Sequence, residues 1–149
     1  MSQFIFRAMP VYDEDKIPDI LKNSKNVAVV GVSDKPDRDS FRVAKYLIAA
    51  GYNVIPVNPM LKVWEGRTSY PTLSEIPGTI KVDVVDVFRR SDAVKPVVED
   101  AIRISPRTIW MQEGVVNVEA ADLAKKNNIL IVMDRCIMKE HHRLMNRPI

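Results

Sequence analysis

The fold is decided by residues 27–40, which read VAVVGVSDKPDRDS. Four consecutive apolar residues lead into Gly31, and a polar turn follows before a helical periodicity begins at Phe41. A short apolar run rich in β-branched residues is typical of a strand buried on both faces of a parallel sheet. The segment therefore predicts a strand, a turn and a helix, the unit from which open α/β sheets are built.

The same alternation continues along the rest of the chain. Further strands are expected at residues 54–57, 82–88, 108–111 and 129–133. Helical periodicity between these runs predicts an α/β fold, namely a Rossmann-like, doubly wound sheet of five parallel strands with right-handed crossovers. We expect a single domain over residues 1–149, whose core spans about 26–136 and carries an N-terminal helix and a C-terminal tail packed on it.

Capping residues mark the expected ends of two helices. Ser40 is the expected N-cap of a helix over residues 41–50, and Gly51 is its expected C-terminal stop. Asn117 is expected to cap a second helix over residues 118–126. Both helices follow predicted strands, as a doubly wound sheet requires.

The composition is that of a globular chain. Hydrophobic residues make up 46% and charged residues 28%, a balance that excludes a disordered chain, and no apolar run is long enough to span a membrane. Residues 1–7 are too short and too interrupted for a secretory signal, and Cys136 is the lone cysteine, so no internal disulfide can form. We therefore expect a soluble, cytoplasmic protein with no membrane partner.

The charge pattern argues against nucleic acid as a partner. The formal net charge is +3 at pH 7, and the strongest basic cluster is only Phe88-Arg89-Arg90. Surfaces that bind nucleic acid concentrate basic residues and interleave them with aromatic residues. We expect no nucleic-acid partner, whereas an anionic small ligand fits the mild excess of positive charge. The sequence leaves a protein partner and the oligomeric state open.

The carboxyl ends of the predicted strands define the expected ligand crevice. The first turn leads into a helix N-terminus, which favours a phosphate, but Ser33 and Pro36 replace the second and third glycines of the dinucleotide fingerprint. The second strand ends in Asn58 and Pro59, with Lys62 nearby, instead of the carboxylate that binds the ribose of NAD. A ribose that carries a phosphate, as in NADP or coenzyme A (CoA), suits these residues better.

Each of these features also has a purely structural interpretation. Gly31 supplies the backbone freedom of a tight turn, Asn58-Pro59 is an ordinary turn dipeptide, and Lys62 is an ordinary surface lysine. From the strand-end residues alone, two interpretations remain open: these residues form a ligand site, or they only form the turns between strands and helices.

Several blocks occur in one order along residues 26–144. They are VAVVGVS (27–33), FRVAKYL (41–47), GYNVIPVNP (51–59), VDVFRR (85–90), WMQ (110–112) and MDRC (133–136). Together they resemble the small CoA-binding proteins that are related to the nucleotide-binding domain of the succinyl-CoA synthetase α subunit. The resemblance implies a Rossmann-type domain that binds CoA or an acyl-CoA as a binding, carrier or regulatory module.

The resemblance also implies which residues bind the ligand. The pyrophosphate cradle would comprise Gly31, Ser33, Ser40, Phe41, Arg42 and Val43. The adenosine and its 3′-phosphate would lie by Asn58, Pro59 and Lys62, and the nucleotide would lie against Phe88 and Arg89. The pantetheine arm would run along Gln112 to Gly114.

We expect no complete active site in this sequence. The synthetase uses a phosphorylated histidine on a second domain, whereas His141 and His142 lie in an expected C-terminal tail and are predicted to belong to a solvated, charged face. One cysteine and two adjacent histidines lack the spacing of metal ligands. We therefore expect binding without catalysis and without a metal. The alternative is an NADP-dependent oxidoreductase or the nucleotide-binding subunit of a larger enzyme.

Cys136 is the candidate for thiol chemistry. A thiol at the carboxyl end of the fifth strand is placed to exchange with the thiol of CoA through a mixed disulfide, and the neighbouring Arg135 favours a thiolate. The alternative is a buried cysteine that acts as a small hydrophobic side chain.

Overall fold

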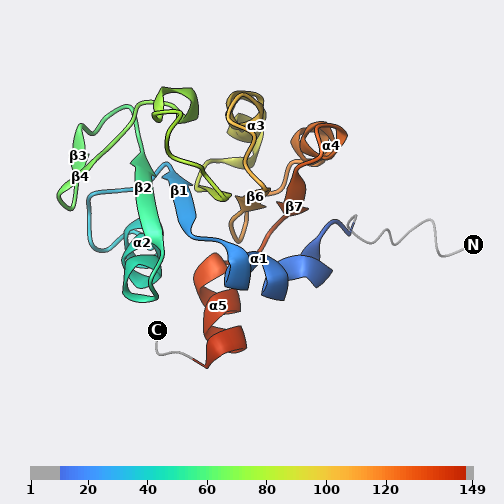
Figure 1. Cartoon of the computed structure of the whole chain (residues 1–149), viewed down its shortest axis with the longest axis horizontal. Helices are drawn as coiled ribbons and strands as arrows, with labels where there is room; N and C mark the ends of the chain where they lie inside the picture. The colour runs from blue at the N-terminus through green and yellow to red at the C-terminus, as the bar shows by residue number, and fades with distance from the viewer. Residues whose placement is uncertain (1–10, 147–149) are drawn as a thin grey trace, which may run out of the picture.

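The computed structural model describes residues 11–146 (Figure 1). Residues 1–10 and 147–149, which include the segment considered as a secretory signal, lie outside the described part. One parallel sheet contains β1 (Asn26–Val30), β2 (Asn53–Val57), β5 (Val84–Val87), β6 (Thr108–Met111) and β7 (Leu130–Val132). The strand order is β2-β1-β5-β6-β7. The predicted Rossmann-like α/β fold with five parallel strands is therefore confirmed.

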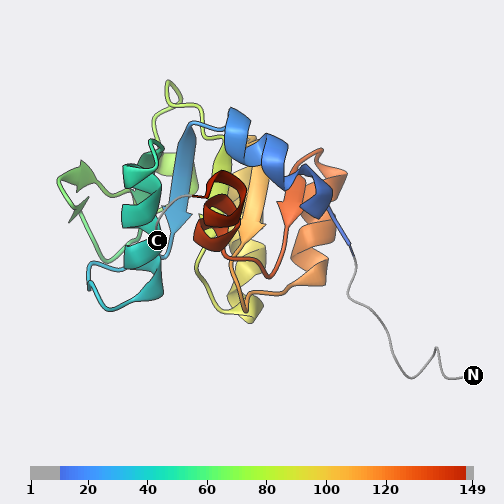
Figure 2. The same ribbon diagram turned by 90° about the horizontal axis from the view of Figure 1, so that it is seen from below.

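Helices cover both faces of this sheet (Figures 1 and 2). One face carries α1 (Ile17–Asn23), α2 (Asp39–Ala49) and α5 (Ile137–Met145), and the other carries α3 (Val94–Ile102) and α4 (Val118–Lys126). Burial on both faces explains why the strands are continuous apolar runs instead of alternating patterns. No helix within residues 11–146 combines the length and the apolar character needed to cross a bilayer.

Shorter elements connect the strands and helices. The strands β3 (Val63–Trp64) and β4 (Arg67–Thr68) form an antiparallel pair after β2. Turns of 3₁₀ helix occupy Glu14–Lys16, Leu73–Glu75 and Ser91–Ala93.

The strand order places a topological switch point between β1 and β5. These two strands are neighbours in the sheet, but the helix that follows β1 lies on one face and the helix that follows β5 lies on the other. The two connections therefore diverge at the carboxyl ends of the strands, which opens a crevice there, as in other doubly wound sheets.

One capping prediction was wrong. Helix α2 begins at Asp39 with Arg38 in the N-cap position, so Ser40 lies inside the first turn. The Ser40 hydroxyl instead accepts a hydrogen bond from the Ser33 backbone N–H at 2.9 Å. The prediction for Asn117 is confirmed, because its side chain accepts from the Ala120 N–H at the start of α4.

The prediction that His141 lies on a solvated, charged face was also wrong. The expected C-terminal tail forms α5, which contacts α1 and α2, and His141 is buried with Nδ1 2.9 Å from the Tyr46 hydroxyl. The periodicity explains this packing, because Ile137 and His141 lie one turn apart on the same face. The charges at Lys139 and Arg143 lie on the exposed side and gave the segment its solvated appearance in the sequence.

Gly31 allows β1 and β5 to approach each other where β1 ends. Its φ is +85°, and a Cβ at this position would lie 2.2 Å from the carbonyl oxygen of Phe88. The Gly31 N–H donates to the Val57 carbonyl on the other neighbouring strand at 2.9 Å. Any side chain here would strain the backbone and push β5 away.

We expect Gly31→Ala to lower the free energy of unfolding by about 2–4 kcal/mol, since it combines left-handed backbone strain with overpacking against Phe88. Urea denaturation measures the loss. Gly51→Ala is the matched control, because Gly51 has a φ of +105° but no atom within 4 Å of the added Cβ. Its expected cost is about 1–2 kcal/mol from the backbone alone. Equal costs for the two variants would contradict the role of the Phe88 contact.

Candidate functional site

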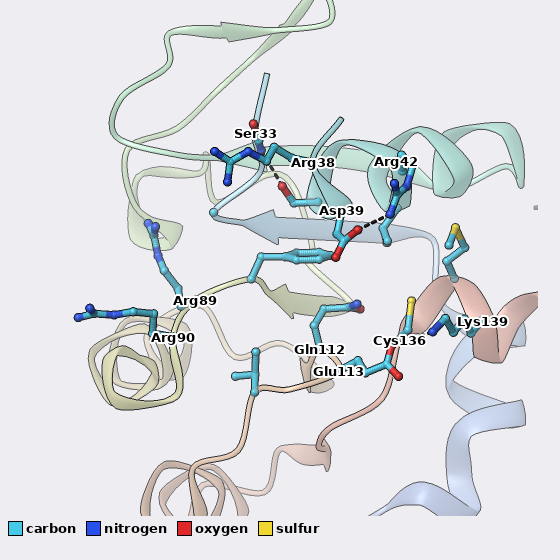
Figure 3. A pocket seen from close by; sticks show the side chains of 16 residues that line it. Ser33, Arg38, Asp39, Arg42, Arg89, Arg90, Gln112, Glu113, Cys136 and Lys139 are labelled. Atoms are coloured by element: carbon cyan, nitrogen blue, oxygen red, sulfur yellow. Dashed lines mark hydrogen bonds and ion pairs between the residues drawn. The ribbon is translucent and has the colours of Figure 1, made fainter. Parts of the chain in front are cut away.

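A cavity of about 740 Å³ opens at the switch point, above the carboxyl ends of β1, β5 and β6 (Figure 3). The first turns of α2 and α5 form further parts of its wall. Its lining consists of Gly31, Ser33, Arg38, Asp39, Ser40, Arg42, Val43, Phe88, Arg89, Arg90, Gln112, Glu113, Val115, Cys136, Met138 and Lys139. The cavity is large enough for a drug-sized ligand.

Positive charge predominates around the cavity. The cationic lining residues are Arg38, Arg42, Arg89, Arg90 and Lys139, whereas the carboxylates are Asp39 and Glu113. Arg42 pairs with Asp39, and Arg90 lies 3.4 Å from Asp92. Within residues 11–146, neither Arg38 nor Arg89 has an ion-pair partner. These two guanidinium groups are therefore available for an anionic ligand.

Two helix N-termini add to this positive potential. Helix α2 begins beside Arg38 and helix α5 begins beside Cys136, and both residues line the cavity. The N-cap side chain of neither helix accepts a backbone hydrogen bond. The positive dipole ends of two helices therefore border the same cavity, which is an arrangement that favours phosphate groups.

Gln112 presents a buried amide to the cavity. The residue is only 4% exposed, and its Oε1 accepts a hydrogen bond from the Ile137 N–H at 3.0 Å, which caps α5. Among the described residues, no acceptor is bound to the Nε2 group, and Figure 3 shows the side chain directed into the cavity. The Nε2 group is open to the cavity, so it can donate a hydrogen bond to an acceptor on a ligand.

Side chains from other elements hold the turn after β1 in shape. The Asn58 amide donates to the Val32 carbonyl at 2.8 Å, and the Trp64 indole N–H donates to the Ser33 carbonyl at 2.8 Å. The Ser33 hydroxyl accepts from the Lys35 N–H at 3.0 Å. The turn is therefore fixed by hydrogen bonds of the chain itself, and no ligand is needed to shape it.

Most of the residues predicted for the site come together here. The cavity is lined by Gly31, Ser33, Ser40, Arg42, Val43, Phe88, Arg89, Gln112 and the candidate thiol Cys136. Phe41, Asn58, Pro59, Lys62 and Gly114 do not line it. Phe41 turns away and packs edge-on against Trp64, with ring centroids 5.7 Å apart. Pro59 and Lys62 are exposed, and no described contact tests their predicted place beside the adenosine.

Gly114 has a structural role in the loop after β6. Its φ is +87°, and its N–H donates to the Asp134 carboxylate at 2.7 Å. Asp134 therefore ties the loop after β6 to the loop after β7. This bond keeps Glu113 beside α5, where Glu113 pairs with Lys139 at 2.9 Å. The hydrogen bond and the charge of Glu113 raise the pKa of Lys139.

Sequence reasoning missed the contribution of α5. Met138 and Lys139 line the cavity because the chain returns over the sheet after β7. The available signal was the helical spacing of apolar residues from Ile137 onward. Arg38 and Asp39 were also missed, although both belong to the turn that was expected to bind phosphate.

A carboxyl group is buried one row beneath the cavity floor. Asp86 lies in β5 two residues before Phe88, so both side chains point to the same face of the sheet. Asp86 is fully buried, and both of its carboxyl oxygens are without a hydrogen-bond partner among the described residues. Desolvation raises the pKa of Asp86 well above its ordinary value. Within the same residues, no cluster of three or more His, Cys, Asp or Glu side chains is placed to hold a metal ion.

Comparison with known proteins points to one family. Residues 25–142 match a family model described as a CoA binding domain. The Bacillus subtilis (strain 168) protein YneT is 42% identical over 126 residues, which cover 85% of this chain and 92% of YneT. The structure of a hypothetical protein from Pyrococcus horikoshii OT3 has 40% identity and a TM-score of 0.85, over 94% of this chain and 99% of that one.

A more distant likeness concerns the fold alone. A dinucleotide-forming acetyl-coenzyme A synthetase from Ca. Korarchaeum cryptofilum matches with a TM-score of 0.67 and 23% identity. The match covers 78% of this chain but only 27% of the synthetase. The domain fold thus also occurs within a much longer protein.

The buried Asp86 makes stability depend on pH. Because its pKa is raised by folding, the folded state holds a proton that the unfolded state releases above about pH 4, and stability falls as the pH rises toward the folded pKa. Asp86→Asn removes this titration. We expect the unfolding free energy of the variant, relative to the unmodified protein, to rise by up to about 1.4 kcal/mol per pH unit in this window. Urea titrations between pH 4 and 8 test this, and a constant difference would contradict it.

Proposed function

Because the chain belongs to the CoA-binding domain family, we propose that it binds coenzyme A or an acyl-CoA in the cavity at the switch point. It acts as a binding, carrier or regulatory module without a complete active site. The proposal includes a cytoplasmic location, since a single free cysteine suits a reducing compartment.

The proposal rests on the groups that meet in one cavity. The free guanidinium groups of Arg38 and Arg89, two helix N-termini and the buried Gln112 amide all face one cavity. CoA is a polyanion at one end and an amide-containing chain that ends in a thiol at the other. Cations and helix N-termini suit the phosphates, and a buried amide donor suits a carbonyl of the pantetheine chain.

The charge distribution gives the ligand a direction. Arg89 and Arg90 lie at one end of the cavity in Figure 3, and Cys136 and Lys139 lie at the other. We place the pyrophosphate between Arg89 and the start of α2, and the pantetheine chain along Gln112. The end that carries the thiol then lies beside Cys136.

A second, smaller cavity suits the adenine ring. It has a volume of about 310 Å³ and shares Arg89 with the first cavity. Its walls are mainly apolar and include Val30, Val57, Leu73 and Val97. An adenine at this place would leave the pyrophosphate beside Arg89. Apolar walls with a few polar groups are usual for such a ring.

Ligand discrimination tests the proposed function directly. We expect CoA to raise the melting temperature, because a ligand at about 100 times its Kd adds roughly 2.7 kcal/mol to the free energy of unfolding. NADP, NAD and ATP at the same concentration should give smaller shifts. Mass analysis of any ligand released by denaturing the purified protein provides a second readout. Stabilisation by NADP and not by CoA would overturn the proposal in favour of a nucleotide-dependent oxidoreductase.

Arg89 should carry a large part of the affinity for CoA. Arg89→Ala removes a guanidinium that lines both cavities, and we expect the Kd to rise by about tenfold to a hundredfold, as for the loss of a charge-assisted hydrogen bond. Isothermal titration calorimetry measures the Kd of each variant for CoA. Arg103→Ala is the matched control, since Arg103 is exposed at the end of α3 and lines neither cavity. An unchanged Kd for Arg89→Ala would place the phosphates elsewhere.

Lys62 is proposed to meet the 3′-phosphate, and a ligand without that group tests this role. We expect Lys62→Ala to weaken CoA several-fold while leaving the Kd for dephospho-CoA unchanged, because dephospho-CoA lacks the phosphate that the ammonium would contact. Isothermal titration at constant salt compares the two ligands. Equal losses for both ligands, or none for either, would remove Lys62 from the site.

A further inference from the structure

We propose that Cys136 exchanges with CoA disulfides, so that the protein carries one CoA as a mixed disulfide. This inference rests on the proposed function, because it needs the pantetheine chain to lie in the cavity. It extends that function from reversible binding to the covalent capture of oxidised CoA.

The position of Cys136 favours this chemistry. The residue lines the cavity at the start of α5 although it is only 7% exposed overall. Its thiol is free, and Met138 and Lys139 lie beside it in the same wall. Such limited exposure favours a disulfide that fits the cavity over disulfides that do not.

Gln112 offers a hydrogen-bond donor to a ligand chain at this place. Its buried amide faces the cavity, and no described acceptor is bound to Nε2. The same side chain binds the Ile137 N–H through Oε1, next to Cys136 in sequence. A carbonyl that accepts from Nε2 would therefore hold a ligand chain close to the residue that carries the thiol.

The charges around Cys136 suit exchange between a thiolate and a disulfide. The positive end of α5 begins at this residue, and Lys139 lies in the same cavity wall. Disulfide exchange proceeds through negatively charged sulfur, both in the attacking and in the leaving group. A helix N-terminus and an ammonium stabilise such charge. Glu113 also faces Lys139 and Asp39 lies in the same cavity wall, so the local field is positive but partly compensated.

A CoA disulfide is the oxidant of Cys136 in the proposed exchange, and no further reactant is needed. The Cys136 thiolate attacks the sulfur of the CoA held in the cavity, the bond between the two CoA sulfurs breaks, and one CoA leaves as a thiolate. A bond between Cys136 Sγ and the retained CoA sulfur replaces it. The proton of the Cys136 thiol is released to solvent, and a small thiol reverses the reaction by the same exchange.

Intact-mass analysis of the full chain tests the proposal. Reduced protein is freed of reductant, incubated with CoA disulfide, denatured without reductant and weighed. We expect an adduct of one CoA minus two hydrogens, which dithiothreitol removes. Because the chain has a single cysteine, the adduct can form only at Cys136. Cys136→Ser should give no adduct under the same conditions.

Comparison of disulfides shows whether the cavity directs the reaction. We expect CoA disulfide to react at least tenfold faster than glutathione disulfide, and desulfo-CoA, which lacks the thiol, to slow the reaction with CoA disulfide. No adduct, or equal rates for the two disulfides, overturns the inference. Calorimetric binding of reduced CoA with reductant present is measured in parallel. If CoA binds but no selective adduct forms, the proposed function stands and the inference about Cys136 is wrong. If CoA does not bind, the proposed function itself is wrong.

Discussion

The close approach of β1 and β5 at Gly31 and Phe88 is the constraint on which the site depends. Without a Cβ on Gly31, the carbonyl of Phe88 can lie against the end of β1 while the Phe88 N–H donates to Val30 at 2.9 Å. Both strands therefore end side by side before their connections diverge to opposite faces. This spacing places the start of α2 and the end of β5 in the walls of the same cavity.

The sheet was predictable because its signals are local and strong. Apolar runs rich in β-branched residues match the strands to within one or two residues at each end, and Asn117 caps α4 as its side chain chemistry indicates. Helix α5 was not predicted from the sequence, because the exposed charged residues of this segment indicated a solvated tail. The opposite face of the helix is apolar and contains the buried His141. Local charge and periodicity conflict in such a segment, and packing against α1 and α2 decides the outcome.

The site was predictable where it follows from the strand ends and from the helix that begins after β1. Gly31, Phe88 and Gln112 line the cavity because the carboxyl ends of neighbouring parallel strands meet there. The role of Asn58 was not predictable, since its amide is bound to the Val32 carbonyl through a loop geometry that has no local signature. Lys139 was missed for a related reason, because it reaches the cavity only through the return of the chain over the sheet.

Several polar groups of the cavity wall are bound by other groups of the chain. Glu113 pairs with Lys139, and the Ser40 hydroxyl accepts a backbone hydrogen bond, as does the Ser33 hydroxyl. A hydroxyl becomes a nucleophile when a neighbouring base takes its proton, and within the described cavity wall neither serine hydroxyl donates to a side-chain base. A thiol differs in this respect, because its reaction with a disulfide needs only a thiolate and a leaving sulfur. Cys136 is therefore the residue of this cavity wall on which the proposed exchange rests.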